Sequence, residues 1–141
     1  MNAARAGQAF AKFSYALANL ERTMKLPETN EDYRNSAILA FLLAQEAAWK
    51  AIKWVLKEKM AIEMAGPKPV LQEAFVQGWL GHDDTVWLDM AEDRNLVAHT
   101  YSAEQAMEIY QRVKRYVLAL RLAHTLLTEK YPDLRPSQVT E

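Results

Sequence analysis

Apolar residues recur at spacings of three and four along most of the chain, which is the periodicity of one face of an α-helix. The pattern predicts a first amphipathic helix over residues 3–24. Proline disfavours helical backbone in the residue before it, so this helix ends before Pro27. The inward stripe consists of Phe10, Phe13, Leu17, Leu20 and Met24.

A second helix is predicted from residues 29 to 61, opened by a polar stretch that suits a helix N-terminus. It is the longest element, about 45 Å at a rise of 1.5 Å per residue. Its early part, Ala37 to Ala44, is apolar all round and must be covered on several sides, either at the bundle centre or at a subunit contact. The later part carries a single stripe of Trp49, Ile52, Leu56 and Met60.

Gly66, Pro67 and Pro69 interrupt the pattern, after which a short helix is predicted over residues 70–77. A loop at 78–84, pinned by Trp79 and Leu80, then leads into a fourth helix over 85–99. Ser102 and Gln105 form a capping-box pattern that opens the last helix, which Pro132 ends. The inward residues of that helix are Ala106, Ile109, Tyr110, Val113, Val117, Leu120 and Leu127.

These elements predict an all-α protein, an antiparallel bundle of four to five helices. The length of 141 residues suits one domain, which we place at residues 1–131, followed by a flexible C-terminal tail at 132–141. Half of the residues are hydrophobic and a quarter are charged, as in ordinary globular proteins, and Ala and Leu far outnumber Val and Ile.

Composition excludes several chemistries. The chain has no cysteine, so thiolate catalysis and Cys-ligated metals are ruled out. The glycines form no phosphate-binding loop, and no apolar run approaches the roughly 18 residues of a membrane span. We therefore expect a cytoplasmic protein with no membrane contact and no cofactor. The net charge of −1 gives no general attraction to nucleic acid, so any RNA contact must be local.

One cluster combines several reactive groups: the octet from Arg94 to Tyr101 holds a guanidinium, an amide, an imidazole and a phenol at a predicted helix end. Asn95 and His99 are four apart and share a face, whereas Arg94 and His99 are five apart and diverge by about 140° on an ideal helix. An imidazole and a guanidinium suit RNA transesterification without a metal, as proton carrier and as contact for the phosphorane charge. Such a pair also arises by chance as a cap, an ion pair or packing.

Concerted acid–base cleavage commonly uses two proton-handling groups, and His99 is the single histidine of this cluster. A symmetric dimer supplies two copies of it.

The octet resembles the R-x4-H-x-Y motif of HEPN domains found beside minimal nucleotidyltransferases, and the flanks are similar to that family too. Three islands match, over a resemblance that spans residues 33–116: residues 41–50 (FLLAQEAAWK), 73–75 (EAF) and 87–95 (WLDMAEDRN). Proteins of this type are described as nucleotidyltransferase substrate-binding subunits. Better understood relatives are HepT-like toxins, which are metal-independent ribonucleases that a partner nucleotidyltransferase silences by adding AMP to the motif tyrosine.

The resemblance implies a homodimer in which Arg94 contacts the phosphate or transition state and His99 acts as acid or base. Asn95 would be an auxiliary polar contact and Tyr101 the acceptor of adenylyl groups. It implies a minimal nucleotidyltransferase as partner and RNA or a nucleotide as ligand, in either a cleaving toxin or a binding subunit.

Other candidates have simpler explanations beside the functional one. Glu46 matches an acidic position of the family and is also spaced for an ion pair with Lys50. Lys50 and Lys53 suit RNA phosphates but equally a solvated helix face. The His82-Asp83-Asp84 run suits a helix cap better than a metal, so no metal site is predicted. His124 has the spacing of a residue at the edge of the bundle.

Overall fold

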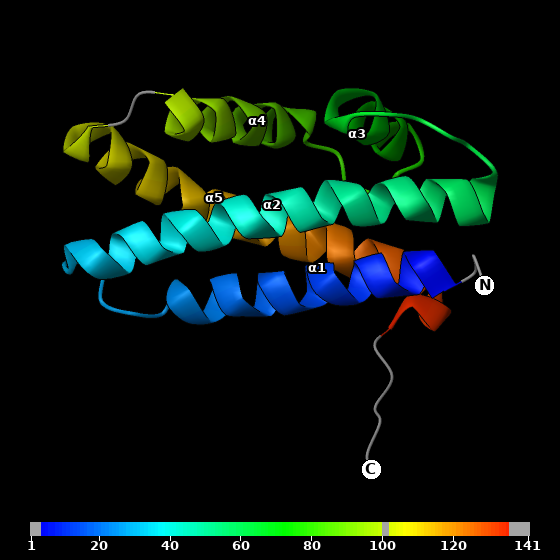
Figure 1. Cartoon of the computed structure of the whole chain (residues 1–141), viewed down its shortest axis with the longest axis horizontal. Coiled ribbons are helices and arrows are strands. Elements are labelled where there is room, and N and C mark those ends of the chain that lie inside the picture. The colour runs from blue at the N-terminus through cyan, green and yellow to red at the C-terminus, as the bar shows by residue number, and fades with distance from the viewer. Residues whose placement is uncertain (1–3, 100–101, 136–141) are drawn as a thin grey trace, which may run out of the picture.

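The computed structural model describes residues 4–99 and 102–135, and these form a bundle of α-helices (Figure 1). The all-α prediction is confirmed. The elements are α1 (Ala4–Thr23), α2 (Glu31–Met60), α3 (Pro67–Val76), α4 (Asp84–His99), α5 (Ala103–Lys130) and a short 3-10 helix, η1 (Pro132–Leu134).

Three long helices, α1, α2 and α5, form the body of the bundle. α1 and α2 run antiparallel and pack along their lengths, and α5 crosses behind them (Figure 1). α3 and α4 lie on one side of this layer, so that α4 rests on α5 (Figure 1). The predicted stripe of α1 faces the centre, because Phe10, Phe13, Leu17 and Leu20 are fully buried.

The apolar half of α2 is only partly covered by the chain itself. Asn30 caps the helix by accepting a hydrogen bond from the backbone N–H of Tyr33, and Phe41 is fully buried. Leu39 and Leu43, in contrast, are 58% and 55% exposed. The all-round apolar stretch is therefore not the covered bundle centre, and the alternative of a subunit contact stays open.

The connection between α3 and α4 is pinned as the sequence predicts, with Trp79 and Leu80 buried. Asp83 caps α4, because its carboxylate accepts hydrogen bonds from the backbone N–H groups of Thr85 and Val86. α3 begins three residues earlier than expected, since Pro67 fits the first turn of a helix, where no backbone donor is needed.

The capping box at the start of α5 is present: Ser102 and Gln105 exchange hydrogen bonds between side chain and backbone. At the other end, η1 packs against α1 and α5, and Leu134 is buried. The packed domain thus extends to at least Leu134, beyond the limit at 131 that the sequence suggested. Residues 136–141 of the expected tail lie outside the described residues.

His124 of α5 is half-buried, as its spacing at the edge of the bundle predicts. Its ring packs on Phe10 and Phe13, with ring centroids 4.6 and 5.4 Å away. Arg121 lies 3.3 Å from Nδ1 and Ser14 Oγ 2.8 Å from Nε2. Since a guanidinium can only donate, Nδ1 accepts and Nε2–H donates to Ser14, which is the hydrogen bonding of a neutral imidazole.

No helix in the part of the chain that the structure describes is both long and apolar enough to cross a membrane.

His124→Gln tests this environment through pH. Burial and the Arg121 charge, opposed by Glu21, lower the pKa of His124 from 6.5 to about 4. As the pH falls through that window the unfolded chain takes up a proton that the folded protein does not, so the folded protein loses stability. The glutamine variant has no such group, so it does not lose stability in this way. The difference in free energy of unfolding between the wild type and the variant, measured by urea unfolding, should therefore shrink between pH 7 and pH 4.5. His82→Gln, on an exposed loop, is the control, and an advantage that stays constant with pH would contradict the assignment.

Candidate functional site

The motif residues occupy the C-terminal half of α4, and the structure places three of them at the surface. The Arg94 side chain is 42% exposed, and Asn95 and His99 are exposed. Asn95 and His99 are four residues apart, so they share a face of the helix as expected. His99 is the last residue of α4. Tyr101, the expected acceptor of adenylyl groups, lies outside the described residues.

Arg94 is held by α2. Its guanidinium lies 3.1 Å from Oε1 of Glu46, which also accepts a hydrogen bond of 3.2 Å from the Trp49 indole. Lys50 lies 3.1 Å from Oε2 of the same carboxylate, which is the i,i+4 pair that the sequence predicts. The fold thus brings Arg94 of α4 beside Glu46 and Lys50 of α2, three candidate residues that lie in two distant segments of the sequence.

Glu46 is a carboxylate at neutral pH. Partial burial raises its pKa, but the hydrogen bonds from Lys50 and Trp49 and the charges of Lys50 and Arg94 outweigh that effect and lower it overall. A group with a lowered pKa is a poor proton donor at neutral pH. Glu46 is therefore suited to orienting Arg94 and Lys50 rather than to transferring a proton.

Arg94 and His99 do not meet within one chain. No hydrogen bond or ion pair joins them, or ties His99 to any other group, among the residues that the structure describes. Their five-residue spacing predicts that the two side chains diverge, and they do, because Arg94 turns toward α2 and pairs with Glu46. Lys53 also lies apart from this cluster, seven residues beyond Glu46, or about 10 Å along α2. The predicted phosphate contacts thus divide, with Lys50 beside Arg94 and Lys53 near Trp54.

Sequence reasoning missed the residue that anchors this helix. Asp93 is buried, and both of its carboxylate oxygens lie 2.7 Å from the Arg112 guanidinium in a bidentate pair. Tyr116 donates a third hydrogen bond, 2.5 Å long, to Oδ2, and its ring stacks on Phe41. A signal was present in the sequence, since Asp93 continues the buried spacing of Val86 and Met90 on α4.

The protonation of this network follows from its burial. Burial raises the pKa of the Tyr116 phenol, and the hydrogen bond to Asp93 and the charge of that carboxylate raise it further. The hydrogen bond and charge of Asp93 likewise raise the pKa of Arg112. The phenol therefore stays protonated and the guanidinium charged, so that Asp93 has three donors facing it at any ordinary pH.

The chain matches, over residues 8–129, the model of a family described as nucleotidyltransferase substrate binding protein like. The protein belongs to that family, which is related to HEPN domains, and the resemblance seen in the sequence is confirmed.

A solved structure agrees with this assignment. A crystal structure of a protein from Thermus thermophilus is 31% identical, with a TM-score of 0.74 over 88% of this chain and 99% of that one. A comparison with curated proteins gives no significant match.

Asp93→Asn is expected to lower the free energy of unfolding by about 2–4 kcal/mol, because it leaves Arg112 without its buried counter-charge. Asp89→Asn is the matched control on the same helix, since Asp89 pairs with Arg115 at the surface and its loss should cost at most about 1 kcal/mol. Urea unfolding at pH 7 measures both. Equal losses in the two variants would show that the buried network does not anchor α4.

Proposed function

We propose that this protein is a metal-independent ribonuclease of the HEPN type, which acts as a symmetric dimer with Arg94 and His99 of both chains in the cleft. The observation that carries the proposal is the exposed cluster of Arg94, Asn95 and His99 at the end of α4. A guanidinium and an exposed imidazole near one helix end suit phosphodiester transesterification, and a dimer can bring the Arg94 and His99 of two chains into one cleft.

The chemistry assigned to the cluster is attack of a ribose 2′-oxygen on the adjacent phosphorus. The P–O5′ bond breaks, a 2′,3′-cyclic phosphate forms and the 5′-oxygen leaves as a hydroxyl. One His99 accepts the 2′-OH proton while the second, from the other chain, gives a proton to the leaving oxygen. Arg94, oriented by the ionised Glu46, stabilises the extra negative charge on the phosphorane. Asn95 and Lys50 act as auxiliary contacts.

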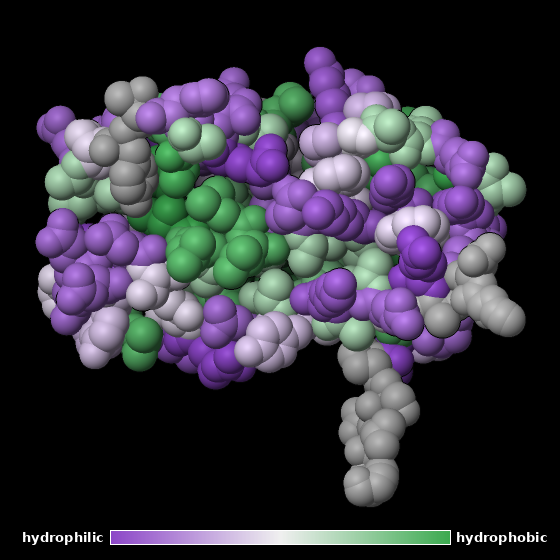
Figure 2. Space-filling view, in the orientation of Figure 1, coloured by the Kyte–Doolittle hydropathy of each residue, from purple (hydrophilic) through white to green (hydrophobic). Residues whose placement is uncertain are grey.

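An apolar patch beside the cluster supports the dimer. The patch consists of Leu39 and Leu43, with the half-buried Leu42 next to them. Figure 2 shows hydrophobic side chains gathered over the N-terminal half of α2, on the side that α4 borders. Leu43 and Glu46 are three residues apart on the same face of α2, so a second copy seated on the patch lies next to Arg94. A two-fold contact there brings both clusters to one interface.

Leu43→Glu should convert the dimer into a monomer, because it places two like charges in the centre of an apolar contact. Sedimentation equilibrium or light scattering on the purified protein measures the mass. Leu118→Glu is the matched control, since Leu118 of α5 is 70% exposed and lies outside the patch. If Leu43→Glu keeps the mass of a dimer, or if Leu118→Glu becomes a monomer, the dimer contact does not lie at this patch.

The purified protein should cleave RNA in excess EDTA, and His99→Ala and Arg94→Ala should each lower the rate by at least about a hundredfold. Gel analysis of a tRNA and mRNA mixture measures the cleavage. His82→Ala and Arg22→Ala, at exposed positions outside the motif end of α4, are the matched controls and should cleave normally. Full activity in either motif variant would exclude that residue from the reaction.

The partner proposed for this chain is a minimal nucleotidyltransferase that silences it by transferring AMP to Tyr101. The motif tyrosine and the family description support the partner. The cleavage assay therefore uses protein made without that partner and checked by intact mass for the absence of AMP. If Tyr101→Phe still gains the mass of AMP in the presence of the partner, another residue is the acceptor.

A second candidate function is a non-cleaving subunit that holds a nucleotide or other substrate for the nucleotidyltransferase. The ion pair between Arg94 and Glu46 favours it, because the carboxylate already compensates the guanidinium that a scissile phosphate must engage. Binding without turnover distinguishes this subunit from the ribonuclease. Calorimetry with nucleotides, with and without the partner, tests it, and no binding in either condition would count against it.

A further inference from the structure

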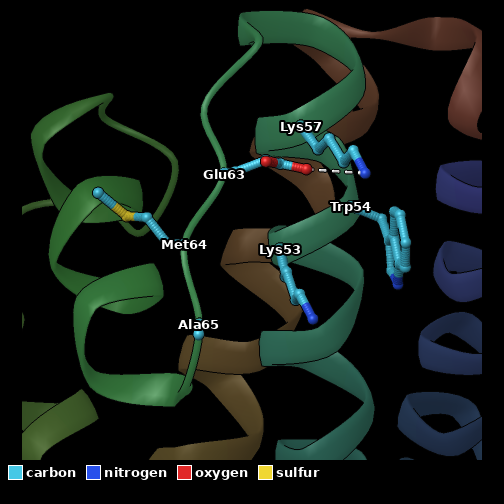
Figure 3. A pocket seen from close by; sticks show the side chains of 6 residues that line it. All are labelled: Lys53, Trp54, Lys57, Glu63, Met64 and Ala65. Carbon is cyan, nitrogen blue, oxygen red and sulfur yellow. Dashed lines mark ion pairs between the residues drawn. The ribbon is translucent and has the colours of Figure 1, made fainter.

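A pocket of about 360 Å³ lies at the C-terminal end of α2, apart from the motif on α4. Its walls are Lys53, Trp54 and Lys57 of α2 and the residues 63–65 that follow the helix (Figure 3). Its volume is in the range of sites for small ligands.

The pocket is built by a reversal of the chain. Ala61 adopts a left-handed conformation with φ of 57°, and the backbone N–H of Ile62 bonds to the carbonyl of Leu56. The following segment is thereby folded back along the last turns of α2, where Glu63 points toward Lys57 and the Met64 side chain points away from α2 (Figure 3).

Positive charge gathers around one aromatic ring in this region. The guanidinium of Arg5 lies 4.7 Å from the centre of the Trp54 ring, and the amino groups of Lys57 and Lys53 lie 5.3 and 5.6 Å from it. Three like charges around one ring repel each other, and an anion among them relieves that repulsion.

The carboxylates nearby leave part of this charge uncompensated. Glu63 pairs with Lys57 at 2.9 Å, and the hydrogen bond and charge of Lys57, with the charge of Lys53, hold its pKa below the usual range. Glu58 accepts a hydrogen bond from the backbone N–H of Ala6. Across residues 4–99 and 102–135, neither Arg5 nor Lys53 has an ion pair with a carboxylate.

We propose that this pocket binds a nucleotide unit, with its phosphate on Lys53 and Arg5 and its base against Trp54. Among the described residues these two cations have no carboxylate partner, so they suit phosphate oxygens, and the indole suits the flat face of a base. The proposal goes beyond cleavage at Arg94 and His99 and does not depend on it.

Two sources provide this ligand chemistry: a free nucleotide and a residue of an RNA strand. Glu46, Lys50, Lys53 and Lys57 are spaced at four, three and four residues, so they form one line along α2 from the Arg94 cluster to the pocket, about 16 Å long. That line suits a strand that passes from one site to the other, whereas the pocket alone suits a mononucleotide.

Isothermal titration calorimetry with two probes tests the proposal. The probes are AMP and a short 2′-O-methyl oligoadenylate, which lacks the 2′-OH needed for cleavage. The wild type should bind at least one of them, and Lys53→Gln should weaken that binding about tenfold through loss of a charge-assisted contact. Trp54→Phe should bind more tightly than Trp54→Leu, because it keeps an aromatic face.

Two variants separate this site from its alternatives. Lys12→Gln removes an exposed lysine on α1 and is the control, which should bind as the wild type does. His99→Ala removes the motif histidine and shows whether the binding belongs to the motif instead. AMP binding that Lys53→Gln weakens identifies a free-nucleotide pocket, and oligoadenylate binding alone identifies a strand contact. The proposal is overturned if folded wild-type protein binds neither probe, or if Lys12→Gln weakens binding as much as Lys53→Gln does. Loss of binding in His99→Ala alone would move the nucleotide to the motif.

Discussion

The buried carboxylate of Asp93 holds the motif helix in place. The apolar anchors of α4 lie in its first half, at Val86, Trp87 and Met90, whereas the second half buries Asp93 instead. Its bonds to Arg112 and Tyr116 join that half to α5, and the next residue, Arg94, joins it to α2 through Glu46. The motif end of α4 is therefore fixed between two helices by these polar contacts, together with Leu96 and Val97, which are partly buried against the core.

This kind of anchor has a direct consequence for the site. Apolar packing is tolerant of rotation and sliding, but a bidentate carboxylate–guanidinium pair has one favourable geometry. Burying Asp93 costs desolvation energy, and its three donors offset that cost only when the helix is correctly seated. Because Asp93 faces inward, Arg94 turns toward α2, and Asn95 and His99 are left facing solvent. The buried Asp93 thus determines which side chains are exposed at the C-terminal end of α4, although it is not exposed there itself.

Hydrophobic periodicity was sufficient to predict the helices, because each buries a regular stripe, and hydrogen-bonding patterns such as Ser102 with Gln105 marked their ends. Hydrophobic periodicity assigns burial from the polarity of each residue, so it failed where a polar residue is buried or an apolar residue is exposed. Asp93 is counted as polar although it occupies a core position, and its partners on α5 are distant in sequence. The apolar pattern of residues 37–44 likewise left open whether Leu39 and Leu43 face the bundle centre or a subunit contact, and the chain leaves both exposed. The motif itself was visible from the sequence, but the direction that Arg94 takes required the position of α2.

The exposed face of α2 orders these features along a single line. Leu39 and Leu43 come first, then Glu46 and Lys50, and last Lys53 and Lys57 beside Trp54. The proposed isologous contact through the leucines would place each Arg94 cluster at the edge of the interface and would leave the pocket at the far end of the helix clear of it. In that arrangement the apolar end of this helix face would bury a second chain, and the cationic end would remain accessible to phosphate. The ion pairs of Glu46 lie between these two ends, so the residue that orients Arg94 also separates the dimer contact from the cationic line.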